Sequence, residues 1–341
     1  MRERFKRFLL LTYQFDAYFA LAHNMPPMLH HQEIGVTLPS TFALWNTYGL
    51  DVFAKRHLEE PPGRSDIQMC EMAHRSGSSS PPLPILVEDV LLGLCGKLQA
   101  IWVLSETSAS QVEGHLDNVS QRIKLSSALD SWKHELDTIN EVASLKDIPN
   151  NPTAARNLLL AYRAEDDSTS ASLKRIKTLI QDATVLYHFL KMSHYLGPAA
   201  QGTKNYRRTE TEPTRASKAD REAFACAQQL LELAEAHSVA GDVGGGASAS
   251  CRALSLNPLL RHAFATGLDV TNSVLSCQKC KCYPGRPSRQ TAASTSMNLE
   301  QWIEAGGPLS INDTPICVCK LEVWSGRFEK AIRDQMKVTG D

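Results

Sequence analysis

Five cysteines near the carboxyl-terminal end come closest, by type and spacing, to a metal site. They are Cys277, Cys280, Cys282, Cys317 and Cys319. Thiolates are soft ligands, and four of them suffice for a tetrahedral zinc site. The spacing departs from two facing Cys-x-x-Cys pairs, and it lacks both the paired histidines of a two-histidine finger and the six-cysteine pattern of the fungal binuclear cluster. Scattered reduced thiols are the alternative interpretation, so we assign no metal and no cofactor.

Acidic pairs are the next candidates for chemistry. Glu59-Glu60, Glu88-Asp89 and Asp166-Asp167 could divide acid and base roles if burial separated their pKa values. Each pair falls in a hydrophilic stretch or at a helix edge, so we expect solvated carboxylates.

Histidines are numerous but scattered. His30-His31 follows a Pro-Pro pair, where we expect a solvated loop, and His188 and His194 are too far apart to meet on one helix face. The sequence contains no His-Glu-x-x-His motif, no Gly-x-Ser-x-Gly elbow and no phosphate-binding loop. We therefore predict no catalytic residue and expect that the chain is not an enzyme.

Composition sets broad limits on partners. The 341 residues are 43% hydrophobic and 21% charged, which is ordinary for a folded protein, and the formal net charge is −1. No global field attracts nucleic acid or an anionic membrane, and the basic segments 1–7 and 204–215 are short or diluted by glutamates. No apolar stretch approaches the length of a membrane span. Nine cysteines, an odd number without framework spacing, indicate reduced thiols inside the cell.

Helical periodicity dominates the elements that must position these residues. The expected helices are the opening segment, 83–106, a stripe from Val112 to Ile139, 153–164, 173–190 and 221–237. The only strand-like run is 315–324. We predict an all-α fold, an irregular multi-helix domain with Pro-rich connections and partly disordered linkers. Within 246–298 no element can be assigned.

Polar stretches suggest the domain boundaries. Segments 75–84, 201–218 and 240–250 are rich in Ser, Pro, Gly or charge, as linkers are. We expect a helical domain in 1–200, a flexible linker with a short helix in 201–250 and a poorly defined region in 251–341.

The opening segment has two interpretations. Its basic start, apolar run and small residues imitate a secretory signal. An amphipathic helix explains it better, because apolar positions recur at three- and four-residue steps along one face. Those positions are Phe5, Phe8, Leu9, Thr12, Phe15 and Phe19.

The next element is sharply punctuated. Pro26 and Pro27 must end the helix, after which the chain runs extended and turns again at Pro39. Three residues, Phe42, Leu44 and Trp45, would then anchor the returning segment on the helix.

Residues 7–56 resemble the fungal-specific transcription factor domain, the helical middle region of fungal zinc-finger regulators. The matching features are Arg7, Asp16, Ala20, Pro26-Pro27, Glu33, Leu38-Pro39 and Trp45. The resemblance extends diffusely to about residue 200.

The resemblance implies a function. It implies a nuclear regulatory domain in 1–200 that controls fungal metabolic or secondary-metabolite genes. Because the motif begins almost at Met1, the DNA-reading zinc module that such regulators place upstream is missing here. Either an upstream exon has been lost from this sequence, or the chain acts without reading DNA directly. We therefore expect doubtful direct DNA binding, and action through protein partners or a homodimer. The target genes, the sign of regulation and any small-molecule effector stay open. The alternatives are a helical enzyme or accessory protein of a biosynthetic pathway, and an interaction scaffold without a transcriptional role.

Overall fold

The computed structural model describes residues 2–75, 85–109, 115–144, 153–164, 168–196, 218–242 and 258–275. Apart from one isolated β-bridge, between Thr37 and Gln68, the regular elements of these residues are helices, which confirms the all-α class. The chain divides into two compact units, residues 1–190 and 191–341, which are considered separately. The domain boundaries expected at residues 200 and 250 fall outside the described ranges and stay predictions.

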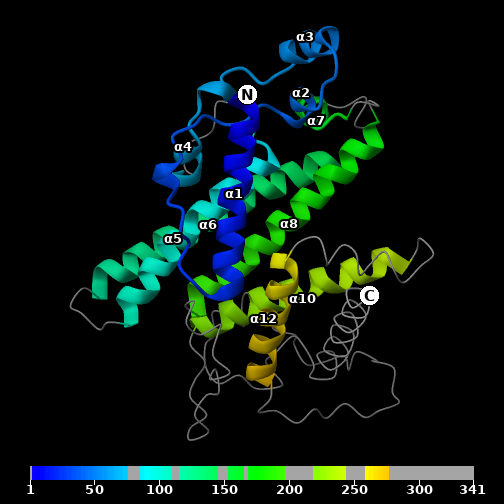
Figure 1. Ribbon diagram of the computed structural model, residues 1–341. Helices are drawn as coiled ribbons and strands as arrows, with labels where there is room; N and C mark the ends of the chain where they lie inside the picture. Colours follow the sequence, from blue (N-terminus) through cyan, green and yellow to red (C-terminus); the bar gives the residue numbers. More distant parts are fainter. Residues whose placement is uncertain are drawn as a thin grey trace, which may run out of the picture. The chain divides into compact units, whose positions relative to one another are not determined.

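The larger elements are labelled in Figure 1. They are α1 (Arg2–His23), α2 (Phe42–Trp45), α3 (Leu50–Leu58), α4 (Met69–His74), α5 (Val87–Ala109), α6 (His115–Ser144), α7 (Thr153–Ala161), α8 (Thr169–Leu196), α10 (Lys218–Asp242) and α12 (Pro258–Leu275). Two short 3-10 helices, η1 (His31–Glu33) and η2 (Arg64–Asp66), lie in the connections.

Helix α5 is the centre of the first unit. Every residue from 91 to 98 is buried, as expected for the apolar run, and α1, α4 and α6 all pack against this helix. Each fully buried leucine contributes about 1.5–3 kcal/mol. Gly96 lets the end of α4 approach, since an added Cβ would lie 2.4 Å from the carbonyl oxygen of Ala73. Although α5 is strongly apolar, none of the helices described here has the length and apolar character that a membrane crossing requires.

The predicted stripe on α6 is confirmed in its second half only. Leu129, Trp132 and Leu136 are buried, whereas Val119 and Ile123 are 45% and 64% exposed. The buried part packs on α5, and Tyr187 of α8 reaches Asp130 of α6 with a hydrogen bond of 2.7 Å.

Helix α1 forms as predicted, but a different face packs. The buried residues are Leu10, Tyr13, Asp16, Ala17, Ala20 and Leu21. The phenylalanines of the apolar face seen in the sequence are largely exposed, so that face is not the one that packs. Both sets recur at helical spacing, and periodicity alone does not say which set meets the core.

The punctuated element follows the predicted course. Helix α1 ends at His23, before Pro26, and the chain then runs extended to pair with segment 67–69. Leu38 N–H donates to Ile67 O, and Met69 N–H donates to Val36 O, each at 2.8 Å. Helix α2 then begins after Thr41, whose hydroxyl caps it. Of the three expected anchors, Leu44 is buried and Trp45 remains 39% exposed.

In the second unit, α10 packs against α12. Phe224, Leu230 and Phe264 are fully buried, and an added Cβ at Gly267 would lie 3.4 Å from Ala227 O. Helix α10 confirms the predicted helix of 221–237. Helix α12 was not predicted, because no pattern could be assigned in that region.

Candidate functional site

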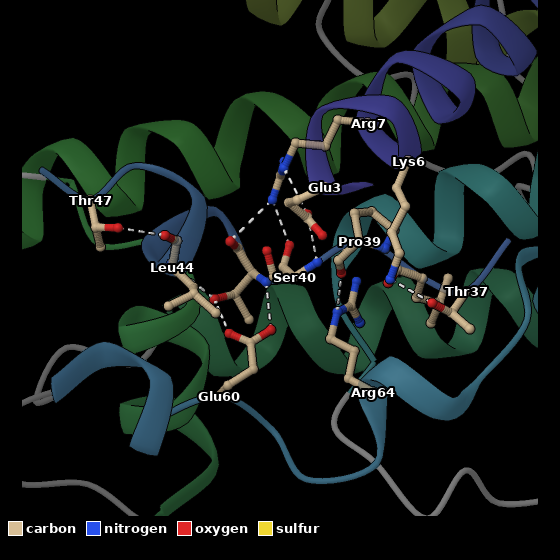
Figure 2. Close-up of polar contacts among 12 residues, drawn as sticks. Glu3, Lys6, Arg7, Thr37, Pro39, Ser40, Leu44, Thr47, Glu60 and Arg64 are labelled. Carbon is tan, nitrogen blue, oxygen red and sulfur yellow. Dashed lines mark hydrogen bonds and ion pairs between the residues drawn. The ribbon is translucent and has the colours of Figure 1, made fainter. Parts of the chain in front are cut away.

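Segment 37–41 is held by charged side chains from separate parts of the chain (Figure 2). On the α1 side, Glu3 accepts a hydrogen bond from the N–H of Ser40 at 2.9 Å. Arg7 donates from Nη2 to the carbonyl oxygens of Ser40 and Thr41, at 2.5 and 3.1 Å. Glu3 and Arg7 are themselves an ion pair across one helical turn.

Two further side chains, Lys6 and Glu60, also bind segment 37–41. Lys6 donates to the hydroxyl of Thr37 and to the carbonyl oxygen of Leu38. Glu60 accepts from both the N–H and the hydroxyl of Thr41, each at 2.7 Å. We define the clamp as segment 37–41 together with the side chains of Glu3, Lys6, Arg7, Glu60 and Arg64. Its bonds go mainly to backbone groups of this non-helical segment, which would otherwise lack partners except at Thr41 O, an acceptor also for Trp45 N–H at 3.1 Å.

Arg64 ties the clamp to the start of α5. Its Nε donates to Pro39 O at 2.9 Å, and its two terminal nitrogens bind both oxygens of Asp89 at 2.7 and 2.8 Å. Arg64 and Asp89 are only 4% and 2% exposed. Asp89 also accepts from the N–H of Leu86 at 2.9 Å, which caps α5.

Tyr162, directly after α7, closes the other side of this helix start. Its hydroxyl accepts from the N–H of Val87 at 3.0 Å and donates to Glu88. The carbonyl of Tyr162 accepts from Arg175 of α8 at 3.0 Å. The amino-terminal end of α5 is thus satisfied by residues distant in sequence, and the carboxylates there complement the helix dipole.

Burial shapes the electrostatics of this region. It raises the pKa of Glu88, against the hydrogen bond from Tyr162, which lowers it. Burial lowers the pKa of Arg7. For Arg64 burial acts in the same downward direction, but the Asp89 carboxylate more than offsets it, so the pKa of Arg64 is raised and the guanidinium stays charged.

The residues of the family resemblance lie around this turn. Asp16, 7% exposed, accepts from the N–H of Leu29 at 2.8 Å, and so fixes the chain after the Pro-Pro pair. Glu33 accepts from the N–H of His30 and completes a capping box around η1. The Arg7 guanidinium lies 5.1 Å from the ring centroid of Trp45.

A second cluster gathers imidazoles beside a buried lysine. The rings of His30 and His74 stack on that of His31, with centroid distances of 4.5 and 5.6 Å. Burial, with His30, His74 and Lys97 nearby, lowers the pKa of His31 to about 4. Lys97 donates to the carbonyls of Ala73 and His74, and burial lowers its pKa to about 8. His31 is buried, so the expectation of a solvated His30-His31 pair was wrong for that residue.

The three acidic pairs predicted from the sequence differ in exposure and in hydrogen-bond partners. Glu59 is exposed and forms an ion pair with Arg163 at 2.6 Å, whereas Glu60 belongs to the clamp. The expectation of solvated carboxylates was wrong for Glu88-Asp89, because their partners Arg64 and Tyr162 were not visible from local sequence. Asp166-Asp167 lies outside the described residues.

The cysteine cluster of 277–319 also lies outside the described residues. Within the described ranges, no three histidine, cysteine or acidic side chains come together as a metal site would require. Cys70, Cys95 and Cys226 are free thiols, and burial raises the pKa of Cys95 to about 12. That thiol is protonated at neutral pH and is a poor nucleophile.

Among the described residues, a hollow beside α8 is lined by that helix. Its lining residues there are Ser170, Leu173, Lys174, Lys177, Thr178 and Gln181. Small-molecule sites bury most of their ligand between several walls, and the described lining supplies one of them. The clamp, by contrast, uses its charges on backbone groups and on one another, an arrangement that fixes a conformation.

No family model, no curated protein and no solved structure matches this chain.

Proposed function

We propose that this chain is a transcriptional regulator whose residues 1–200 act as a helical regulatory domain for fungal metabolic or secondary-metabolite genes. The proposal rests on one observation, that residues of the family resemblance act together on one segment of the structure. Arg7, Asp16 and Glu33 each bind the backbone of the same excursion between α1 and α2. These three residues therefore belong to one structural unit. The residues of a family motif commonly share a unit in this way.

The character of the contacts supports a binding and regulatory role over catalysis. The buried charges of the clamp and of the α5 start are engaged with backbone groups or with opposite charges. Such an element presents a fixed surface to protein partners, and the regulator would act through them in the nucleus.

Transcript profiling tests the proposal. A strain lacking the gene is compared with its parent, and with a strain in which the wild-type gene is restored. We expect a coordinated change in a set of metabolic genes that restoration reverses, and a fluorescent fusion that gathers in the nucleus. Unchanged transcripts together with a missing metabolite would overturn the proposal and favour the alternative of a pathway enzyme.

A tethering assay separates a regulatory role from an indirect effect. The full chain is fused to an unrelated DNA-binding module upstream of a reporter gene. A regulator changes reporter output in either direction, whereas the module alone does not. The matched control is the same fusion carrying Asp89→Asn, which breaks the buried pair with Arg64 and destabilises the folded domain, so a signal that depends on that domain should weaken.

A further inference from the structure

Helix α1 carries a second apolar face that its own unit leaves open. On this face Phe5, Phe8, Phe15 and Phe19 are 56%, 66%, 62% and 41% exposed. Their neighbour Leu11 is 63% exposed. Isolated exposed apolar residues are ordinary, but a contiguous row of large aromatic rings along one helix marks an interaction surface.

The row has the spacing of a coiled-coil seam. We define the seam as Phe5, Phe8, Thr12, Phe15, Phe19 and Ala22. Successive members alternate by three and four residues, which is the a/d repeat of two paired helices. The repeat runs for about 25 Å along the axis at 1.5 Å per residue. The face that packs on α5 is a different one.

The polar side chains on and beside this face already form hydrogen bonds within their own unit. Thr12, in the middle of the seam, donates its hydroxyl to Phe8 O at 2.8 Å, so its methyl group can be buried without loss of a hydrogen bond. Asp16 flanks the seam but binds Leu29 N–H within its own unit and is 7% exposed. No unpaired carboxylate therefore opposes burial of the row.

We propose that the seam is a dimer interface in which α1 pairs antiparallel with α1 of a second copy of this chain. The spacing of the seam, three-four-three-four-three, reads the same in both directions, so an antiparallel copy meets it in register. In that register Phe8 faces Phe19 of the partner subunit, and Thr12 faces the partner's Phe15. A two-fold axis makes such an interface self-complementary.

Charge selects the antiparallel direction. The first turn of α1 carries Arg4, which is exposed. In an antiparallel pair this cation lies beside the negative end of the partner helix's dipole, whereas in a parallel pair the two Arg4 side chains would face each other. The proposal is independent of any role in transcription.

The exposed area is sufficient for a weak dimer. If the four phenylalanines and Leu11 became fully buried, they would lose at most roughly 550 Å² in each copy, or about 1,100 Å² for the pair. This exceeds the roughly 1,000 Å² that a specific interface needs. We expect dissociation in the micromolar range, because an interface near that lower bound leaves little surplus over the cost of association.

Sedimentation equilibrium of the full chain tests the dimer directly. The wild-type mass should rise from 37.6 kDa towards twice that value as concentration passes through the micromolar range. Phe8→Glu and Phe19→Lys should each raise the Kd about 100-fold or more, since each removes an aromatic anchor from both copies. The control, Leu58→Glu, replaces a residue that is 86% exposed on α3 and should leave the Kd unchanged.

Mixing the two variants tests the register. In the antiparallel pair, Phe8→Glu of one copy meets Phe19→Lys of the other, so an equimolar mixture should dimerise although each variant alone does not. A mixture that stays monomeric overturns the antiparallel arrangement. Wild type that stays monomeric at every concentration overturns the dimer. Equal loss of dimer in Leu58→Glu would also overturn the seam.

Discussion

Gly93 of α5 lies against the indole of Trp132 on α6, so close that an added Cβ would be 2.2 Å from two ring carbons. Trp132 is 2% exposed and is the largest of the fully buried side chains. A bulky ring on one helix thus requires the smallest residue on the other. This pairing sets how closely the two central helices of the first unit approach.

Gly93→Ala should destabilise the protein by about 2 kcal/mol, because overpacking outweighs the gain of about 1 kcal/mol in helix propensity. The measurement is urea unfolding followed by circular dichroism. Gly35→Ala is the matched control, since an added Cβ there would meet nothing within 4 Å. Equal midpoints for both variants would contradict the tight contact.

Asp89→Asn should reduce the free energy of unfolding by about 3–5 kcal/mol, because it leaves the buried guanidinium of Arg64 without its counter-charge. Asp137→Asn removes the carboxylate of a solvent-facing pair with Lys133, in which Asp137 is 50% exposed, and should cost less than about 1 kcal/mol. Comparing the denaturant midpoints of the two variants checks this. A small effect at Asp89 would mean that the pair is not buried in solution.

Arg7→Lys keeps the charge but loses the planar guanidinium, whose Nη2 donates to two carbonyls and whose plane lies over the ring of Trp45. We expect a loss of about 1–3 kcal/mol, the range for a hydrogen bond from a charged group. Thermal unfolding measures it, with Arg4→Lys on the exposed side of the same helix as control. An unchanged Tm for Arg7→Lys would show that charge alone holds segment 37–41.

Protonation of His31 should make stability depend on pH. Its pKa falls from the usual 6.5 to about 4 in the folded protein, so between these values the unfolded chain binds a proton that the folded chain does not. Stability is therefore fully present above about pH 6.5 and decreases as the pH falls towards 4. Chemical unfolding across this window measures the slope.

His31→Leu should flatten that slope, because the leucine binds no proton in either state. His57→Leu, at an exposed position of α3, should retain it. Identical slopes in wild type and His31→Leu would assign the pH dependence to other groups.

Local pattern predicted the helices well and their packing less well. The apolar run of α5 and the stripe from Leu129 to Ile139 are buried as expected, because a continuous or strongly periodic pattern leaves few alternatives. Helix α1 carries two apolar faces, and the more aromatic one is exposed. Which face meets α5 depends on residues far along the chain, which periodicity does not encode.

The polar site was the least predictable part. Glu88-Asp89 reads as a hydrophilic helix start, and only Arg64 and Tyr162, 25 and 74 residues away, make it a buried network. His31 is buried for the same reason, since His74 and Lys97 come from later helices. Arg7, Asp16 and Glu33 could be recognised in the sequence as a motif. That their side chains bind backbone groups could not be predicted from it.

The cap that Tyr162 places on α5 has a consequence for synthesis on the ribosome. Val87 is made 75 residues before the hydroxyl that accepts its N–H. At roughly 5–20 residues per second, the start of α5 waits about 4 to 15 s for this partner. During that interval α1 is already complete, and its aromatic face is uncovered, as it is in the folded unit. The nascent chain therefore passes through a stage at which chaperones can reach apolar surface while the start of α5 still lacks its cap.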